Sequence, residues 1–198
     1  MVAAASTRRY EKRRRAETFA ATRAAILDAA LALGDPRAPL AQVAERAGVS
    51  ERTVLRHFGT RDGLVAAAIG EGASRVEAER FAVPSADLDA AVANLVDHYE
   101  REGDGVLRLL AEEGADEGID AILAEGRAMH RRWVEQKLGP LLGRLETRTR
   151  RRRLAQLAAA CDVYAWKLLR RDSGLSRAEA ERAIAETVAA TIAIGAGR

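Results

Sequence analysis

The feature that most constrains this chain is a stretch at residues 39–64, in which two short amphipathic segments flank a glycine. In the first segment, apolar residues recur at i, i+3, i+4 and i+7, which is the spacing of one helix face. These residues are Leu40, Val43, Ala44 and Ala47. Gly48 then ends the predicted helix, because glycine adopts the left-handed conformation of a helix C-terminus at little cost.

The segment after this glycine predicts a second short helix with one apolar and one cationic face. Ser50 is a suitable N-cap, because its hydroxyl can accept a hydrogen bond from a free backbone N–H. Val54 and Phe58 are four residues apart and are expected to pack inward. Arg52 and Arg56 have the same spacing and then share the outward face. This arrangement is typical of a helix-turn-helix unit, whose second helix fits the major groove of DNA.

The stretch AERAGVSERTVLRHFGTRDGLVAAA, at residues 44–68, resembles the N-terminal signature of the tetracycline-repressor (TetR) family of transcriptional regulators. A shorter stretch, YAWKLLRRDSGLSRAEAE at residues 164–181, is similar to the C-terminal dimerisation segment of some members. The resemblance implies an all-helical homodimer that binds a palindromic operator in double-stranded DNA. It also implies that an unidentified small-molecule effector makes the dimer release DNA or change state.

The resemblance places the DNA contacts on the second short helix and its flanks. The predicted contact residues are Ser50, Arg52, Thr53, Leu55, Arg56, His57 and Arg61. The guanidinium groups of Arg52 and Arg56 have a fork geometry that matches guanine or phosphate. Leu55 stands where the family usually has tyrosine, so it can touch only sugar or a thymine methyl group. The alternative for each cation is an ordinary solvated surface charge.

The charge of the chain is unevenly distributed and favours a polyanionic partner at the N-terminal end. Residues 1–61 hold 12 Lys and Arg against 6 Asp and Glu, a net charge of +6. Residues 62–198 hold 20 against 23, a net charge of −3. Neutralising DNA phosphates with such a surface releases counterions, which supplies the sequence-independent part of affinity. The alternative is a solvated basic tail, since residues 8–15 alone carry six of these cations.

Several protein classes find no support in the sequence. A run of about 18 apolar residues, which a transmembrane helix needs, is absent. The N-terminus lacks the apolar stretch of a signal peptide, and the single cysteine, Cys161, cannot form an internal disulfide. We therefore expect a cytoplasmic protein. No G-x-S-x-G, P-loop or G-x-G-x-x-G motif is present, so we expect no enzyme.

Helical spacing predicts an all-α fold with an N-terminal three-helix helix-turn-helix domain, and the resemblance implies that the helical bundle after it serves ligand binding and dimerisation. We assign residues 1–16 to a basic tail that is unstructured without DNA, 17–61 to the DNA-binding domain and 62–198 to the bundle. The other expected elements are a first helix from about Thr18 to Leu33, helices over 60–79, 106–112, 119–138 and 150–171, a helix from Ser85, a turn at 102–105, a loop at 112–120, and a last helix over 177–194.

The bundle offers few candidates for a ligand site. We predict that His98, Tyr99, Met129 and Trp133 line a pocket between helices, with ordinary core as the alternative for each. His98 and His130 have no partner at metal-ligand spacing, so we predict no metal site and no cofactor. The acidic loop at 112–120 is a candidate Mg²⁺ site, but its glycines indicate a solvent-exposed loop instead. Cys161 lies on an apolar face and is expected in the core.

Taken together, the sequence predicts a ligand-responsive repressor that dimerises through helices near residues 150–171 and 177–194. One alternative is a DNA-binding regulator without a small-molecule ligand, controlled by a protein partner. A more distant alternative is a helical binding module whose DNA-binding head has lost its function.

Overall fold

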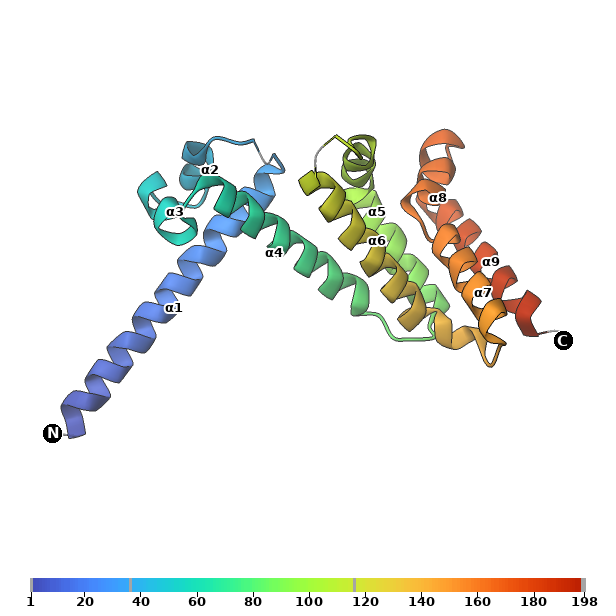
Figure 1. Cartoon of the computed structure of the whole chain (residues 1–198), viewed down its shortest axis with the longest axis horizontal. Coiled ribbons are helices and arrows are strands. Elements are labelled where there is room, and N and C mark those ends of the chain that lie inside the picture. The colour runs from blue at the N-terminus through green and yellow to red at the C-terminus, as the bar shows by residue number, and fades with distance from the viewer. Residues whose placement is uncertain (1, 36, 116, 197–198) are drawn as a thin grey trace. The chain divides into compact units, whose positions relative to one another are not determined.

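The computed structural model describes residues 2–35, 37–115 and 117–196. The elements are α1 (Val2–Leu33), α2 (Leu40–Arg46), α3 (Glu51–Phe58), α4 (Arg61–Phe81), α5 (Leu88–Ala111), α6 (Glu117–Lys137), the 3-10 helix η1 (Gly139–Leu142), α7 (Thr147–Ala160), α8 (Val163–Lys167), the π-helix η2 (Leu168–Asp172) and α9 (Arg177–Ala196) (Figure 1). Over the described residues these helices are joined by turns and short loops, without a strand. The predicted all-α fold class, with a helix-turn-helix domain at the N-terminus, is confirmed.

The chain forms two compact units, the first ending at Arg75 and the second beginning at Val76, so that α4 contributes to both. The first unit packs α1, α2, α3 and the start of α4 around a small apolar core. Its buried residues are Ile26, Leu27, Ala29, Val43, Ala44, Val54 and Leu64. These side chains include the inward face predicted for the two short helices, and that spacing is what fixes α3 against α1 and α2.

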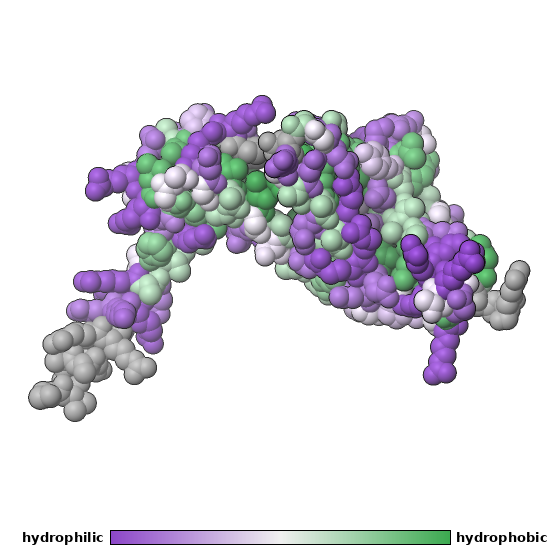
Figure 2. Space-filling view, viewed as in Figure 1, coloured by the Kyte–Doolittle hydropathy of each residue, from purple (hydrophilic) through white to green (hydrophobic). Residues whose placement is uncertain are grey.

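The N-terminal segment differs from our expectation. We predicted a tail over residues 1–16 and a helix from about Thr18, but α1 already begins at Val2. The sequence contains no proline or glycine before Gly34, and such residues are what normally interrupt a helix. Burial in α1 starts only at Ile26, and the apolar residues Phe19 and Ala20 are exposed. Hydrophilic side chains accordingly cover the described part of this helix before Phe19 (Figure 2).

The second unit is a bundle with a larger core formed by α5, α6, η1, α7, α8 and α9. Its fully or nearly buried apolar residues are Ala91, Val92, Leu95, Val96, Tyr99, Trp133, Val134, Leu138, Leu142, Leu157, Cys161, Val163, Trp166, Ile184 and Val188. Cys161 therefore lies in the core, as predicted, and burial raises the pKa of its thiol to about 12. Such a thiol stays protonated at neutral pH and is a poor nucleophile.

Two further elements correct the sequence prediction. We expected a turn at residues 102–105, but α5 runs unbroken through them. Conversely, we expected one helix over 150–171, and the structure breaks it after Ala160. Asp162 caps the next helix by accepting a hydrogen bond from the backbone N–H of Tyr164 at 2.9 Å. An aspartate that can cap a new helix start competes with helix continuation, which explains the break.

Gly103, inside α5, is required by packing. The ring of Trp166 lies directly against Gly103, and a Cβ atom added there would sit 2.5 Å from Trp166 Cζ3. The indole Nε1 of Trp166 donates to Glu100 at 2.9 Å, and Arg170 donates two hydrogen bonds to the same carboxylate. Because the hydrogen bonds from Arg170 stabilise the ionised carboxylate of Glu100, the pKa of Glu100 falls to about 2. This network joins α5 to the stretch that resembles a dimerisation segment.

We expect Gly103→Ala to destabilise the protein by about 1–3 kcal/mol, because the added methyl group overpacks a filled site against Trp166. Gly105→Ala is the matched control, since its nearest neighbour is the flexible Arg108 side chain at 3.7 Å. That change should stabilise α5 by about 0.5–1 kcal/mol, because alanine favours a helix interior over glycine. Urea unfolding measures both, and equal effects of the two substitutions would contradict the packing argument.

Candidate nucleic-acid interface

The helix-turn-helix turn forms as the local chemistry of its residues requires. Gly48 has a φ of 67°, the left-handed conformation that only glycine adopts without strain. Ser50 then caps α3, and its hydroxyl accepts a hydrogen bond from the backbone N–H of Thr53 at 3.2 Å. Val54, on the inward face of α3, is fully buried. The turn and the cap therefore fix where α3 begins and which face it turns inward.

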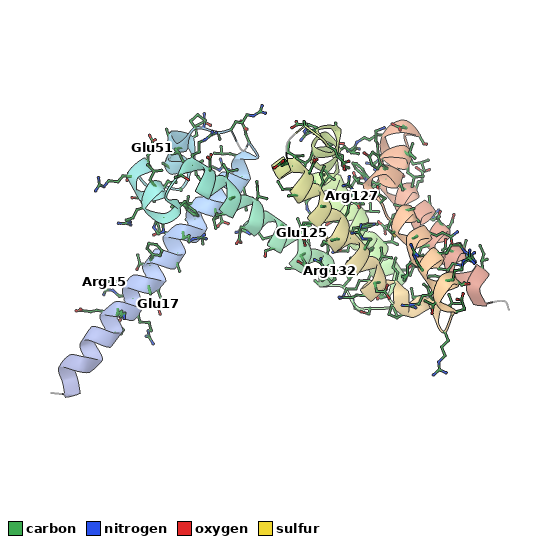
Figure 3. All side chains as sticks on the ribbon, in the orientation of Figure 1. Arg15, Glu17, Glu51, Glu125, Arg127 and Arg132 are labelled. Carbon is green, nitrogen blue, oxygen red and sulfur yellow. The ribbon has the colours of Figure 1, made fainter. Side chains whose placement is uncertain are left out.

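The outward face of α3 is cationic, as predicted. Arg52 and Arg56 are exposed, and Leu55 between them is 40% exposed. Glu51 lies at the start of the helix, where a negative charge suits the helix dipole (Figure 3). The structure thus presents two exposed guanidinium groups on one short helix, and each group has the fork geometry for bidentate recognition of guanine or phosphate.

The two hydroxyl groups near the start of α3 interact with each other. The Oγ of Ser50 lies 3.0 Å from Oγ1 of Thr53, and Thr53 is half-buried. Each oxygen can still accept or donate one further hydrogen bond, because a hydroxyl has one proton and two lone pairs. A contact to DNA from either residue therefore stays a prediction that this geometry permits.

His57 is held in a different environment from the other predicted contact residues. Its ring stacks at 3.9 Å, centroid to centroid, on the ring of Phe19 from α1. Both ring nitrogens are buried and make no hydrogen bond to any described residue. Burial, with the charges of Arg56 and Arg23, lowers the pKa of His57, so the ring is neutral at pH 7. A phosphate contact from His57 would require the ring to turn away from Phe19.

The sequence did not identify two residues of α1 that support α3. Phe19 stacks on His57, and Arg23 lies with its guanidinium carbon 4.8 Å from the ring centre of Phe58. The two are four residues apart and so share one helix face. That spacing was the available signal, although the aromatic partners on α3 are visible only in the folded unit.

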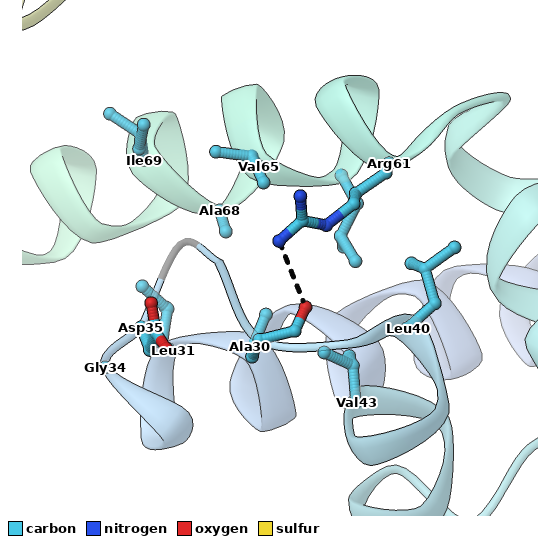
Figure 4. A pocket seen from close by; sticks show the side chains of 12 residues that line it. Ala30, Leu31, Gly34, Asp35, Leu40, Val43, Arg61, Val65, Ala68 and Ile69 are labelled. Atoms are coloured by element: carbon cyan, nitrogen blue, oxygen red, sulfur yellow. Dashed lines mark hydrogen bonds between the residues drawn. The ribbon is translucent and has the colours of Figure 1, made fainter.

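Arg61 begins α4 and borders an apolar pocket of about 200 Å³ in the first unit. Its guanidinium donates to the backbone carbonyl of Ala38 at 3.4 Å (Figure 4). The pocket walls come from α1, α2 and α4 and include Leu31, Val43 and Ala68. Arg61 therefore ties the start of α4 to the loop before α2, and a role as a phosphate clamp stays a prediction.

The N-terminus of α2 has no side-chain cap. Pro39 occupies the N-cap position, and no side chain there accepts a hydrogen bond. This helix end therefore lacks the roughly 1 kcal/mol that a serine or threonine cap supplies. Packing of Val43 and Ala44 in the core holds α2 instead.

The comparison with family models identifies this unit. Residues 26–68 match the model described as bacterial regulatory proteins, tetR family. The N-terminal domain that these residues form is therefore of the TetR type. A search of curated proteins and a search of solved structures each gave no match. The match spans α2, α3, the end of α1 and the start of α4, and by this domain the chain is a DNA-binding transcriptional regulator. Regulators of this family are generally non-enzymatic.

In the bundle, three of the four predicted ligand residues are buried close together. His98 and Tyr99 on α5 are 4% and 5% exposed, and Trp133 on α6 is fully buried. Met129 is only half-buried. The residue that sequence analysis missed is Arg80, whose guanidinium lies against the rings of Tyr99 and Trp133. A lone arginine near the end of α4 gives no sequence signal that distinguishes it from a surface charge.

The acidic stretch at 112–120 begins at Glu112, the C-cap of α5, and ends in the first turn of α6. Within it, the backbone N–H of Gly114 donates to Asp120 at 2.8 Å, and residue 116 lies outside the described residues. The described ranges contain no group of three or more His, Cys, Asp or Glu placed to hold a metal ion. In the same ranges, each helix is too short or too polar to cross a lipid bilayer.

Proposed function

We propose that this regulator is a ligand-responsive repressor that binds a palindromic operator as a homodimer. The observation that carries the proposal is the exposed pair Arg52 and Arg56 on α3, within a domain that matches the TetR family. Residues 17–61 read DNA, and residues 62–198 bind the effector and form the dimer. A palindromic site requires two recognition helices about one turn of DNA apart, which a single copy cannot supply.

Exposed apolar side chains on the last helices support the dimer. Tyr164 and Leu168 are 52% and 57% exposed, and Ile194 on α9 is 66% exposed. Hydrophobic side chains also reach the visible surface among α7, α8 and α9 (Figure 2). Large exposed apolar residues favour an interface with another protein surface. A second copy of the chain is the partner that the stretch at 164–181 indicates by its resemblance.

The proposed mechanism couples the bundle to the DNA-binding domain through α4. An effector bound in the bundle shifts α4 and thereby changes the spacing of the two recognition helices. This works only if the effector prefers one spacing by a few kcal/mol, because a ligand that binds both states equally shifts nothing. The alternative is control by a protein partner without an effector.

Fragments that the protein selects from genomic DNA should contain the operator. Footprinting on them should then show two protected half-sites about 10 base pairs apart.

Light scattering should give a dimer mass. Leu168→Glu places a charge in the proposed interface and should convert the dimer to a monomer and weaken operator binding at least tenfold. Gln136→Glu, at an exposed position on α6, is the control and should change neither. A wild-type monomer at micromolar concentration would rule out the two-half-site model.

A further inference from the structure

A buried cation in the bundle has no charge partner. Arg80 is 2% exposed and lies near the end of α4. Its guanidinium carbon is 4.5 Å from the ring centre of Trp133 and 5.8 Å from that of Tyr99. Trp133 Nε1 donates to the backbone carbonyl of Arg80 at 2.9 Å and fixes the arginine backbone in place. Arginine keeps its charge even when buried, so this site holds a positive charge away from water.

The unpaired atoms of Arg80 form one edge of its guanidinium. Both Nε and Nη2 are buried and make no hydrogen bond to any described residue. Nε and Nη2 lie on the same side of the planar group, and together they donate the two parallel hydrogen bonds with which arginine binds a carboxylate. A buried charge is costly unless it is paired and hydrogen-bonded, so this edge is the place where an anion would stabilise the bundle most.

The carboxylates nearest in the sequence and fold have other partners. Glu79, next to Arg80 in α4, pairs with Arg101 on the surface. Asp162 caps α8 through the backbone N–H of Tyr164. Among the described residues, no ion pair includes Arg80, so none of them supplies a salt-bridge partner for that edge.

Two neutral histidines complete the surroundings. Burial and then the charge of Arg80 lower the pKa of His98 to about 4, and burial lowers the pKa of His130. The Nδ1 atom of each ring is buried without a hydrogen-bond partner among the described residues. His130 stacks on Trp133, with ring centres 6.1 Å apart, and its Nε2 lies 3.0 Å from the carbonyl of Ala158. The site thus combines one cation, two neutral polar rings and apolar walls.

We propose that Arg80 binds the carboxylate of a small organic acid, which is the effector of this regulator. The Nε and Nη2 edge of Arg80 donates to the two carboxylate oxygens, and the apolar body of the acid lies against the rings of Trp133 and Tyr99. This inference rests on the proposed ligand-responsive function and adds the chemical class of its ligand. Neutral analogues bind weakly, because they leave the buried charge unpaired.

Matched acids and amides test the site on the full-length protein. Hexanoate, benzoate and phenylacetate are each compared with the corresponding amide, up to 10 mM, by thermal unfolding and calorimetry. At least one acid should bind at least tenfold more tightly than its amide and raise the Tm. Arg80→Met should abolish this preference. If no acid outperforms its amide, or if the preference survives in Arg80→Met, the proposal is overturned.

A control variant and the unliganded protein keep the test decisive. Arg132→Met removes an arginine of α6 that pairs on the surface with Glu125 and Glu77, and it should leave the acid preference intact (Figure 3). Without acid, Arg80→Met should have a Tm equal to or above that of the wild type, since methionine needs no counter-ion. A clearly lower Tm would instead make Arg80 a structural element of the core and overturn the proposal.

DNA binding separates this proposal from the function on which it rests. If the acid binds through Arg80 but leaves operator affinity unchanged, the anion site stands and the ligand-responsive repressor fails. If the operator is bound and no acid binds, the DNA-binding regulator stands and the Arg80 site fails. If both hold, the acid should lower operator affinity at least fivefold in the wild type and not in Arg80→Met.

Discussion

Replacing Arg52 and Arg56 together with alanine is expected to lower operator affinity by at least two orders of magnitude. Each bidentate contact from an arginine to a guanine is worth about 1–3 kcal/mol of discrimination, and 1.4 kcal/mol corresponds to a factor of ten. Both side chains are exposed on α3 and touch no core residue, so the fold should survive the change. Fluorescence anisotropy with the selected operator, at one fixed salt concentration, measures the loss.

The matched control is Arg131→Ala, an exposed arginine in the second unit. It removes one positive charge, whereas the double variant removes two, and it lies outside the proposed interface, so operator affinity should change less than twofold. Specificity gives a second criterion, because the double variant should bind operator and random DNA almost equally. Retention of full specific binding by the double variant would show that α3 is not the recognition helix.

Trp166→Ala is expected to destabilise the bundle by about 3–5 kcal/mol. The side chain is fully buried, fills the space against Gly103 and donates to Glu100, so its removal leaves a cavity and an unpaired group. Urea unfolding followed by the fluorescence of Trp133 measures the loss within the same unit, since the chain has only two tryptophans.

Trp166→Phe serves as the control for volume. It keeps an aromatic ring against Gly103 and removes only the hydrogen bond to Glu100, so the expected loss is about 1–2 kcal/mol. The charged partner Arg170 still holds Glu100 through two hydrogen bonds. Equal losses for alanine and phenylalanine would mean that packing against Gly103 contributes little.

The elements that the sequence predicts well are those fixed by local chemistry. The boundaries of α2 and α3, the Ser50 cap and the left-handed Gly48 each depend on residues within one or two helical turns. The α3 exposure pattern follows from a spacing of four residues. Helix types and the outward position of Arg52 and Arg56 were therefore available without coordinates.

The features that the sequence did not reveal depend on what lies opposite a residue. Gly103 suggests a turn when it is considered alone, yet α5 continues because the Trp166 ring occupies the place of a side chain. His57 resembles an exposed helix-end residue, yet Phe19, distant in the sequence, covers it. In both cases the deciding partner comes from another helix, which spacing along one segment does not reveal.

For this protein, the sequence by itself determined the helix-turn-helix, its cationic outer face and the family to which that unit is similar, because caps, glycines and helical spacing act over a few residues. Only the tertiary structure decided the state of Arg80. From sequence alone, a charged side chain is expected to face water. The packing of the bundle instead places Arg80 against Tyr99 and Trp133, with no carboxylate partner among the described residues. Burial and pairing are properties of the assembled core, and they convert an unremarkable arginine into the strongest candidate for a ligand contact.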